Sequence, residues 1–219
     1  MSIANPITYL TPLLDELEKK FPDNRTINLV CHGHSVPTGY FATPWINTFD
    51  AYPHLLHRLV KERFPFAAVN VITTSIGGEE SASGAKRFTE DVLTHKPDLV
   101  TIDYGLNDRR LSLEETEKAW RSMIEACQEK GIPVILLTPT WDNSYYNRTE
   151  DWKKLCDRAD LIRRLADEYS VGLADSFAAF SEYVQRDEML TDLLSHGNHP
   201  TRKGHELVAR ELGRFFPAR

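Results

Sequence analysis

Short apolar runs rich in β-branched residues recur five times along the chain. Such nearly continuous runs are typical of strands buried on both faces of a parallel sheet, because helices then cover both sides of each strand. The runs are Ile27–Cys31, Ala68–Ile72, Leu99–Ile102, Val134–Leu137 and Val171–Ala174. We therefore expect a sheet of five parallel strands.

Between these runs, apolar residues repeat at the spacing of a helix. The stretches with this pattern are Tyr52–Phe64, Ser112–Cys127, Leu155–Tyr169 and Leu207–Phe215. Pro53 suits a first helical turn, Ser112 with Glu115 forms a capping-box signature, and Gly131 is placed to end the second helix. Strands that alternate with helices predict an α/β fold with right-handed crossovers. No repeat or Pro/Gly/Ser-rich linker interrupts the pattern, so one domain is expected over residues 1–219.

Composition narrows the class of protein. Of 219 residues, 41% are hydrophobic and 26% charged, which is ordinary for a globular enzyme-sized domain and excludes a disordered or fibrous chain. The formal net charge is −6 without a basic cluster, so a nucleic-acid partner is not expected. No apolar run approaches the ~20 residues that span a bilayer, so no membrane partner is expected.

The N-terminus and the cysteines point to a cytoplasmic protein. Residues 1–6 lack a basic segment followed by an apolar one, so no signal peptide is visible. Cys31, Cys127 and Cys156 form no CxxC pair, which leaves neither a disulfide framework nor zinc-ribbon spacing. The oligomeric state leaves no mark in the sequence.

Polar segments follow the predicted strands, and in open parallel sheets ligands bind outside the carboxyl ends of the strands. These segments are His32–Ser35, Ser75–Glu79, Gly105–Asp108 and Pro139–Asp142, with His196–Pro200 just before the last helix. Together they supply a serine, a histidine, glycines and an asparagine at one edge of the sheet. Acyl transfer needs this set, namely a nucleophile, its base and donors for a developing oxyanion.

In this arrangement the chain resembles the SGNH/GDSL hydrolases, over about residues 27–216. The family block Gly-Asp-Ser resembles Gly33–Ser35, with His34 in place of Asp, and a second block resembles Ser75–Glu80. The block Gly-x-Asn-Asp matches Gly105–Asp108, and Asp-x-x-His-Pro resembles His196–Pro200, with His196 in place of Asp. The resemblance implies a flavodoxin-like, three-layer α/β/α fold and cofactor-free, metal-independent ester hydrolysis.

The resemblance also implies roles for single residues. Ser35 would attack an ester carbonyl, and His199 would take its proton and pass it to the leaving alcohol. The main-chain amides of Ser35 and Gly78 and the side-chain amide of Asn107 would hold the oxyanion.

The two histidine replacements are departures from the family pattern. The family's acid lies three residues before the catalytic histidine, where this chain has His196. A main-chain carbonyl near His196 could orient His199, which would leave a Ser–His dyad. Alternatively, the carboxylate of Asp192 or Asp175 could take the place of the family's acid. If neither holds, the site is impaired. At His34 the effect is expected to be milder, because the family's Asp there mainly shapes the turn.

The substrate is indicated only by an aromatic segment. Trp141 and Tyr145 stand among polar residues, which is typical of a binding loop for a sugar ring, and His34 and His196 are further candidate substrate contacts. We expect a short-acyl, acetyl-type ester on a carbohydrate or another small molecule. A lysophospholipase or thioesterase with a deep apolar pocket, and a non-catalytic binding protein that has lost the acid, remain alternatives.

A metal site is not expected. His32 and His34 are two residues apart and could be joined by His196 and His199, as in a zinc hydrolase. The pattern HxHxDH, however, needs Asp-His after the second histidine, where Val36 and Pro37 stand, and the sequence has no HExxH.

Overall fold

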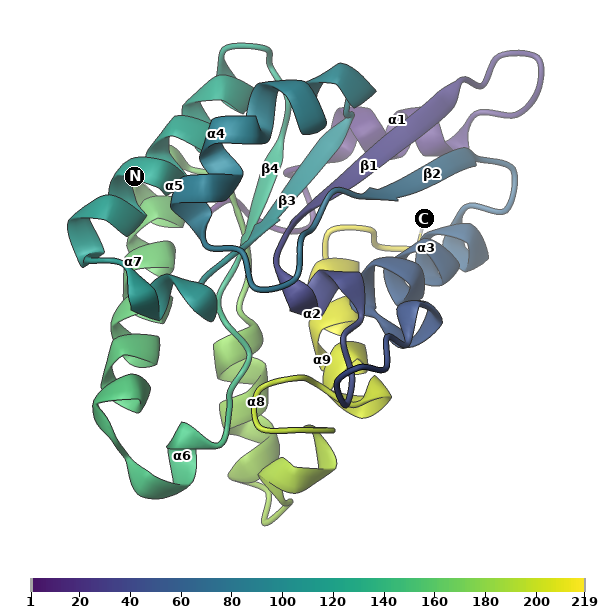
Figure 1. Ribbon diagram of the computed structural model, residues 1–219. Helices are drawn as coiled ribbons and strands as arrows, with labels where there is room; N and C mark the ends of the chain where they lie inside the picture. Colours follow the sequence, from purple (N-terminus) through teal and green to yellow (C-terminus); the bar gives the residue numbers. More distant parts are fainter. Residues whose placement is uncertain (1, 219) are drawn as a thin grey trace.

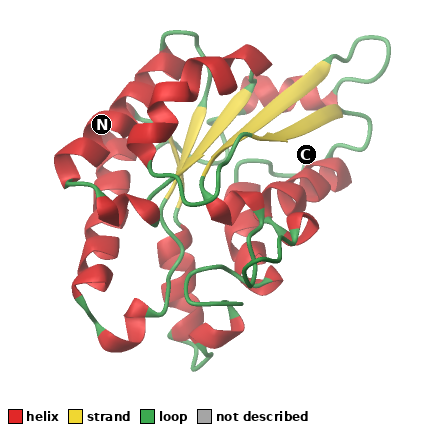
Figure 2. Cartoon of the chain, viewed as in Figure 1, coloured by secondary structure: helices red, strands yellow, loops and turns green. Residues whose placement is uncertain are grey.

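A computed structural model describes residues 2–218 and contains a five-stranded, all-parallel sheet (Figure 2). The strands are β1 (Thr26–Gly33), β2 (Ala68–Thr73), β3 (Leu99–Asp103), β4 (Val134–Leu137) and β5 (Gly172–Ala174). All five predicted strands are confirmed. Their order is β2-β1-β3-β4-β5, so the chain turns to opposite sides of β1 when it forms β2 and then β3. This reversal opens a crevice at the carboxyl ends of β1 and β3, where ligands bind in such sheets.

Helices cover both faces of the sheet, as predicted (Figure 1). One face packs against α1 (Thr11–Glu18), α3 (Tyr52–Arg63), α8 (Ser176–Val184) and α9 (Arg202–Gly213). The other packs against α4 (Ser81–Asp91), α5 (Leu113–Gln128) and α7 (Glu150–Tyr169). The shorter helical segments are α2 (Ser35–Thr38), α6 (Ser144–Asn147), η1 (Thr48–Asp50), η2 (Leu93–His95), η3 (Asn107–Arg110) and η4 (Leu190–Asp192). Within residues 2–218, no helix has the length and hydrophobicity needed to cross a membrane.

The four predicted long helices are confirmed as α3, α5, α7 and α9, whereas α1, α4 and α8 were not predicted. Helix α4 shows why. It packs through small residues, and a Cβ on Gly84 would lie 2.3 Å from the Tyr104 hydroxyl. A face that packs closely because side chains are absent leaves no apolar stripe in the sequence. The predicted capping box is present, since the Ser112 hydroxyl accepts from the Glu115 amide at 3.1 Å and Glu115 accepts from the Ser112 amide at 2.9 Å.

Strand β2 departs from the expected burial on both faces. Ala68, Asn70 and Thr73 are exposed, while Val69 and Val71 pack against the core. The reason is topological, because β2 is an edge strand that pairs only with β1.

Candidate active site

The turn that carries Ser35 begins where β1 ends. A Cβ on Gly33 would lie 2.4 Å from the Asp103 carbonyl oxygen, so only glycine lets β1 and β3 approach this closely here. Ser35 follows as the first residue of α2 and is 6% exposed. The His34 Nδ1 atom accepts from the Val36 amide at 3.3 Å and so caps this short helix.

His34 lies beneath Ser35 rather than facing the solvent. Its side chain is 1% exposed, with Nδ1 3.5 Å from the Ser35 hydroxyl and Nε2 3.4 Å from an Asp103 carboxylate oxygen. Because Nδ1 accepts a hydrogen bond, the ring proton resides on Nε2 and faces Asp103. The burial does not agree with the expected substrate contact by His34. The burial of His34 agrees instead with a structural role in the turn, at the position where the family has Asp.

His199 lies within hydrogen-bond distance of Ser35. Its Nε2 lies 3.1 Å from the Ser35 hydroxyl oxygen, and its Nδ1 lies 3.0 Å from the Phe41 carbonyl oxygen. A carbonyl can only accept, so Nδ1 carries the proton and the Nε2 lone pair is free to accept from Ser35. Burial lowers the pKa of His199, and the bond to the Phe41 carbonyl opposes this only in part. The imidazole is therefore neutral at pH 7, as general-base catalysis requires.

No carboxylate within residues 2–218 takes the place of the missing acid. His196 is exposed, Asp192 accepts from the Tyr183 hydroxyl at 2.8 Å, and Asp175 caps α8 and pairs with Arg163. The group at Nδ1 is a main-chain carbonyl, but one 158 residues earlier in the chain and not one near His196. No sequence signal could have identified it, because every residue has a carbonyl.

The Phe41 carbonyl belongs to a small hairpin, residues 40–46. Tyr40 and Ile46 form an antiparallel bridge, the Phe41 amide donates to the Trp45 carbonyl at 2.9 Å, and the Trp45 amide donates to the Ala42 carbonyl at 2.8 Å. The Tyr40 ring lies against His199, with 5.8 Å between the ring centroids. The hairpin thus fixes the base through both a carbonyl and a ring.

The glycine turn after β2 reaches the same place. The Ile76 amide donates to the Gly33 carbonyl at 3.1 Å, so the turn starts beside the nucleophile strand. A Cβ on Gly77 would lie 2.7 Å from the Tyr40 ring, and Gly78 adopts φ +80° with open space around it. Tyr40 therefore connects the Gly77–Gly78 turn to His199.

Asn107 begins η3 and is held toward the same turn. Its side-chain amide donates to the Glu79 carbonyl at 2.8 Å, and the second N–H of the amide remains for another acceptor. Asp108 is buried and accepts from the Ser81 amide and from the Trp120 indole N–H, both at 2.7 Å. Burial raises the pKa of Asp108 to about 6. Asp108 thus ties the two loops together and does not reach solvent.

Behind the turn, Glu79 holds a buried polar network that sequence reasoning missed. Its carboxylate accepts from the Tyr104 hydroxyl at 2.7 Å and from Arg87 Nε at 2.8 Å. The Tyr104 hydroxyl also lies 3.0 Å from His32 Nε2, and His32 Nδ1 lies 2.9 Å from the Thr74 hydroxyl. Both nitrogens of His32 are thus engaged, and burial lowers its pKa to about 4. His32 supports the loops and does not converge with the other histidines.

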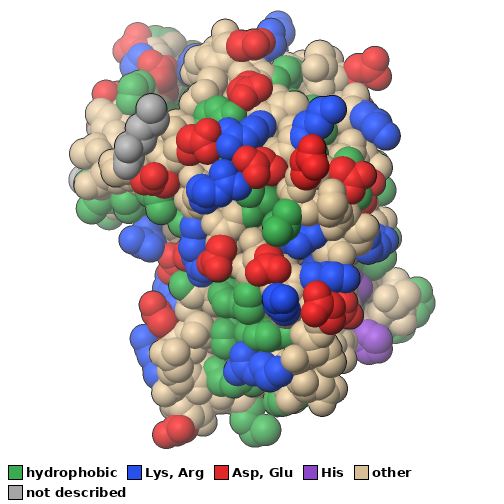
Figure 3. All heavy atoms as spheres, turned by 90° about the vertical axis from the view of Figure 1, so that its left-hand side faces the viewer, with side chains coloured by type: hydrophobic (Ala, Val, Ile, Leu, Met, Phe, Trp, Pro, Cys, Tyr) green, Lys and Arg blue, Asp and Glu red, His purple; other side chains and the backbone are tan. Residues whose placement is uncertain are grey.

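Trp141 and Tyr145 meet, but as part of an aromatic cluster between α6, α7 and α8. Their rings stack at 4.7 Å, and together with Trp152 and Phe177 they line a cavity of about 540 Å³. On the side of the molecule shown in Figure 3, hydrophobic side chains gather below an area where acidic and basic side chains are intermixed. Trp141 is only 5% exposed, so its ring does not offer the free face that was expected; Trp45, in the hairpin, is 70% exposed.

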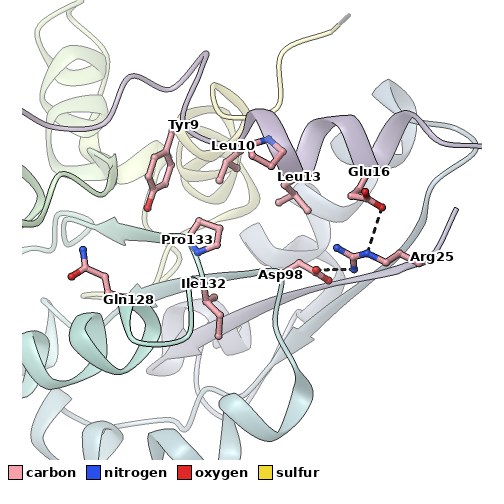
Figure 4. Close-up of a pocket in the computed structure, with 11 residues that line it drawn as sticks. Tyr9, Leu10, Leu13, Glu16, Arg25, Asp98, Gln128, Ile132 and Pro133 are labelled. Carbon is pink, nitrogen blue, oxygen red and sulfur yellow. Dashed lines mark ion pairs between the residues drawn. The ribbon is translucent and has the colours of Figure 1, made fainter.

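A second cavity, of about 580 Å³, lies at the opposite end of the sheet (Figure 4). It adjoins the amino ends of the strands, and Arg25 there bridges Glu16 and Asp98 at 3.4 and 2.7 Å. The charged groups in this cavity pair with one another and supply no nucleophile and base. The carboxyl ends of the strands therefore hold the candidate active site.

Comparison with known proteins agrees with this geometry. Residues 31–207 match the GDSL-like Lipase/Acylhydrolase family. The chain belongs to this family. It is 26% identical to an acetylxylan esterase from Geobacillus stearothermophilus over 165 residues, covering 69% of this chain and 74% of that protein. It is 27% identical to an arylesterase from Vibrio mimicus over 150 residues, covering 66% of this chain and 70% of that protein. This GDSL-family chain is thus an ester hydrolase of the SGNH type.

Solved structures show the same fold. The crystal structure of Axe2, an acetylxylan esterase from G. stearothermophilus, superposes with a TM-score of 0.75 at 23% identity, over 87% of this chain and 94% of that one. A putative lipolytic protein of the G-D-S-L family from Desulfitobacterium hafniense DCB-2 gives a TM-score of 0.69 at 23% identity. The superposition covers 86% of this chain and 98% of that one. The predicted fold class is confirmed.

Proposed function

We propose that this protein is a serine esterase that removes a short acyl group, above all acetyl, from a saccharide. The observation that carries the proposal is the arrangement at His199. Nε2 lies 3.1 Å from the Ser35 hydroxyl, while the opposite ring nitrogen is held by a carbonyl in the tautomer a base needs. Nucleophile and base are thus within hydrogen-bond reach, and the base is itself oriented.

The reaction follows from this geometry. Ser35 Oγ attacks the ester carbonyl carbon while its proton passes to His199 Nε2. The resulting imidazolium, whose Nδ1–H points at the Phe41 carbonyl dipole, protonates the leaving alcohol. Water then attacks the acyl-serine, loses a proton to the same Nε2, and releases the acid as the proton returns to Ser35.

Three donors are assigned to the oxyanion: the Ser35 amide, the Gly78 amide and the Asn107 side chain. The unused N–H of Asn107 supports this assignment, and so does the open space at Gly78. Preorganised donors of this kind stabilise the charge that develops in the transition state, and removal of one typically costs about 10²–10³ in kcat.

A saccharide ester is supported by two observations. One relative is named an acetylxylan esterase, and the exposed aromatic ring of Trp45 lies on the hairpin that contacts His199. An exposed aromatic face suits the flat apolar face of a sugar ring.

The test is the hydrolysis of p-nitrophenyl acetate by Ser35→Ala, with Ser75→Ala as the matched control. Ser75 is a serine at the same sheet edge whose hydroxyl donates to the Cys31 carbonyl. Ser35→Ala should lose at least about 10³ in kcat while remaining folded, and Ser75→Ala should stay near the wild type. Asn107→Ala should lower kcat and kcat/KM together.

Labelling identifies the nucleophile independently. An organophosphate should add to Ser35 and to no other residue, as read by mass spectrometry. Retained activity in folded Ser35→Ala, or a label elsewhere, would overturn the proposal. A series of p-nitrophenyl esters of increasing acyl length separates an acetylesterase, whose rate falls with length, from a lysophospholipase or thioesterase, whose rate rises.

A further inference from the structure

We propose that the 40–46 hairpin couples saccharide binding to catalysis: a sugar ring that stacks on Trp45 seats the Phe41 carbonyl on His199 Nδ1. This inference rests on the proposed function, since it takes His199 as the base. It adds Trp45 as a specificity residue and gives the Phe41 carbonyl a positioning role that the substrate controls.

The exposure of the hairpin is the first argument. Ser35 and His199 are 6% and 9% exposed, but no side chain from Phe41 to Asp50 is buried. Trp45 and Ile46, at 70% and 45% exposure, lie on the strand that returns from the turn. Segments with few buried contacts open locally at small free-energy cost. The group that orients the base is therefore held by backbone bonds at the protein surface.

Connectivity within the hairpin is the second argument. Its base is anchored, because the Tyr40 amide donates to the Ser35 carbonyl at 3.1 Å and the Asn47 amide donates to the Gly39 carbonyl at 2.8 Å. Its tip is closed by the bond from the Phe41 amide to the Trp45 carbonyl. A displacement of Trp45 thus passes to the Tyr40–Phe41 peptide unit, and through the Cα atom of Phe41 to the adjoining unit whose carbonyl contacts His199.

The third argument is the chain distance between the base and its acceptor. The family's acid lies three residues before the histidine and moves with it. Here the acceptor is 158 residues away, and only a tertiary contact brings it to Nδ1. A ligand that binds the seated hairpin better than the open one shifts this equilibrium. If the seated state is populated about one-tenth of the time without sugar, full seating raises kcat about tenfold.

The experiment compares Trp45→Ala with the wild type on acetylated xylobiose and on p-nitrophenyl acetate. The variant should lose about tenfold in kcat on the saccharide ester and stay within about twofold on the small ester, which has no sugar ring to stack on Trp45. Trp45→Phe, which retains a ring, should recover most of the loss. Phe66→Ala removes an exposed ring at the other end of the sheet and should leave both substrates unaffected.

Proton NMR supplies a readout that does not depend on turnover. The Nδ1–H resonance of His199 should sharpen and move downfield when xylobiose is added to the wild type, but not when it is added to Trp45→Ala. A rise in KM alone would show that Trp45 only binds sugar, and an unchanged resonance at saturating xylobiose would show that the hairpin is already seated. Either result overturns the coupling, whereas failure of Ser35 labelling would overturn the proposed function itself.

Discussion

Two imidazoles approach the Ser35 hydroxyl, and an oxygen lies on the far side of each. The His199 ring bonds to the Phe41 carbonyl, whereas His34 Nε2 lies 3.4 Å from an Asp103 carboxylate oxygen without forming a hydrogen bond. His34 takes the place of the Asp in the family block, and its Nδ1 performs the same helix-capping bond that an Asp oxygen would make.

This pairing predicts that the family's residue cannot simply be restored. His34→Asp would place a second buried carboxylate, at about the position of the present Nδ1, on the side of the turn that faces Asp103, whose carboxylate now lies 3.4 Å from Nε2. We expect the single variant to lose stability and the double variant His34→Asp/Asp103→Asn to recover it, with an interaction energy of about 1–3 kcal/mol in a double-mutant cycle. Urea denaturation of the four proteins measures it; additive effects would contradict the pairing.

The lowered pKa of His199 sets the acid limb of activity. His199 must be neutral to accept the Ser35 proton, and its pKa lies below the ordinary 6.5 because the ring is buried. The kcat/KM for p-nitrophenyl acetate should therefore reach a plateau toward neutral pH and fall at lower pH in a one-proton step with its midpoint below 6.5. A midpoint above 6.5 would show that the base is solvated or that another group titrates.

At the scale of elements, loops after three different strands meet at the Tyr40 ring. The ring contacts His199 on the last loop and leaves no room for a side chain at Gly77. We therefore expect the position of the His199 ring to depend on Gly77, a residue that does not contact it.

Gly77→Ala is expected to push the Tyr40 ring toward His199 and to lower kcat by at least about tenfold, because small misplacements of a base are costly. Gly131→Ala is the matched control, since Gly131 adopts φ +65° in open space far from the site. That change should cost about 1–2 kcal/mol of stability and leave kcat unchanged. If Gly77→Ala kept full activity at wild-type stability, Tyr40 would not position the base.

The same elements show what a sequence can and cannot reveal. The five strands were predictable because each is a short apolar run. The place of Ser35, Gly78 and Asn107 at one edge of the sheet was predictable because each follows a strand, whereas their catalytic roles stay predictions. Helix α4 escaped because its packing face is made of small residues. The acceptor for His199 could not be predicted because every residue carries a main-chain carbonyl. The burial of Trp141 could not be predicted either, because it depends on how α7 and α8 pack over the ring.

Across the whole molecule, a buried hydrogen bond joins α3, which follows the loop after Ser35, to α9, which follows His199. His205, at the start of α9, is 2% exposed and its Nδ1 accepts from the Tyr52 amide at 3.3 Å, which satisfies a free donor in the first turn of α3. Burial lowers the pKa of His205 to about 3. The stability that neutral His205 contributes is fully present above pH 6.5 and is lost as the pH falls from 6.5 toward 3.

His205→Asn tests this contribution, because the Asn oxygen can still accept from the Tyr52 amide but does not titrate. Between pH 6 and 4, the free energy of unfolding should change less steeply with pH in the variant, by about 1.4 kcal/mol per pH unit. Chemical denaturation at several pH values gives both slopes. Parallel curves would mean that His205 titrates alike in the folded and unfolded chain.

The bond between Ser35 and His199 spans 164 residues, and the bond from His199 to Phe41 spans 158. Synthesis on the ribosome, at about 5–20 residues per second, therefore delivers the nucleophile long before its base and before α9. A nascent chain that ends before residue 199 holds Ser35 without its partner. If Ser35 and His199 act as proposed, ester hydrolysis begins only after the segment with His199 has emerged and docked beside β1.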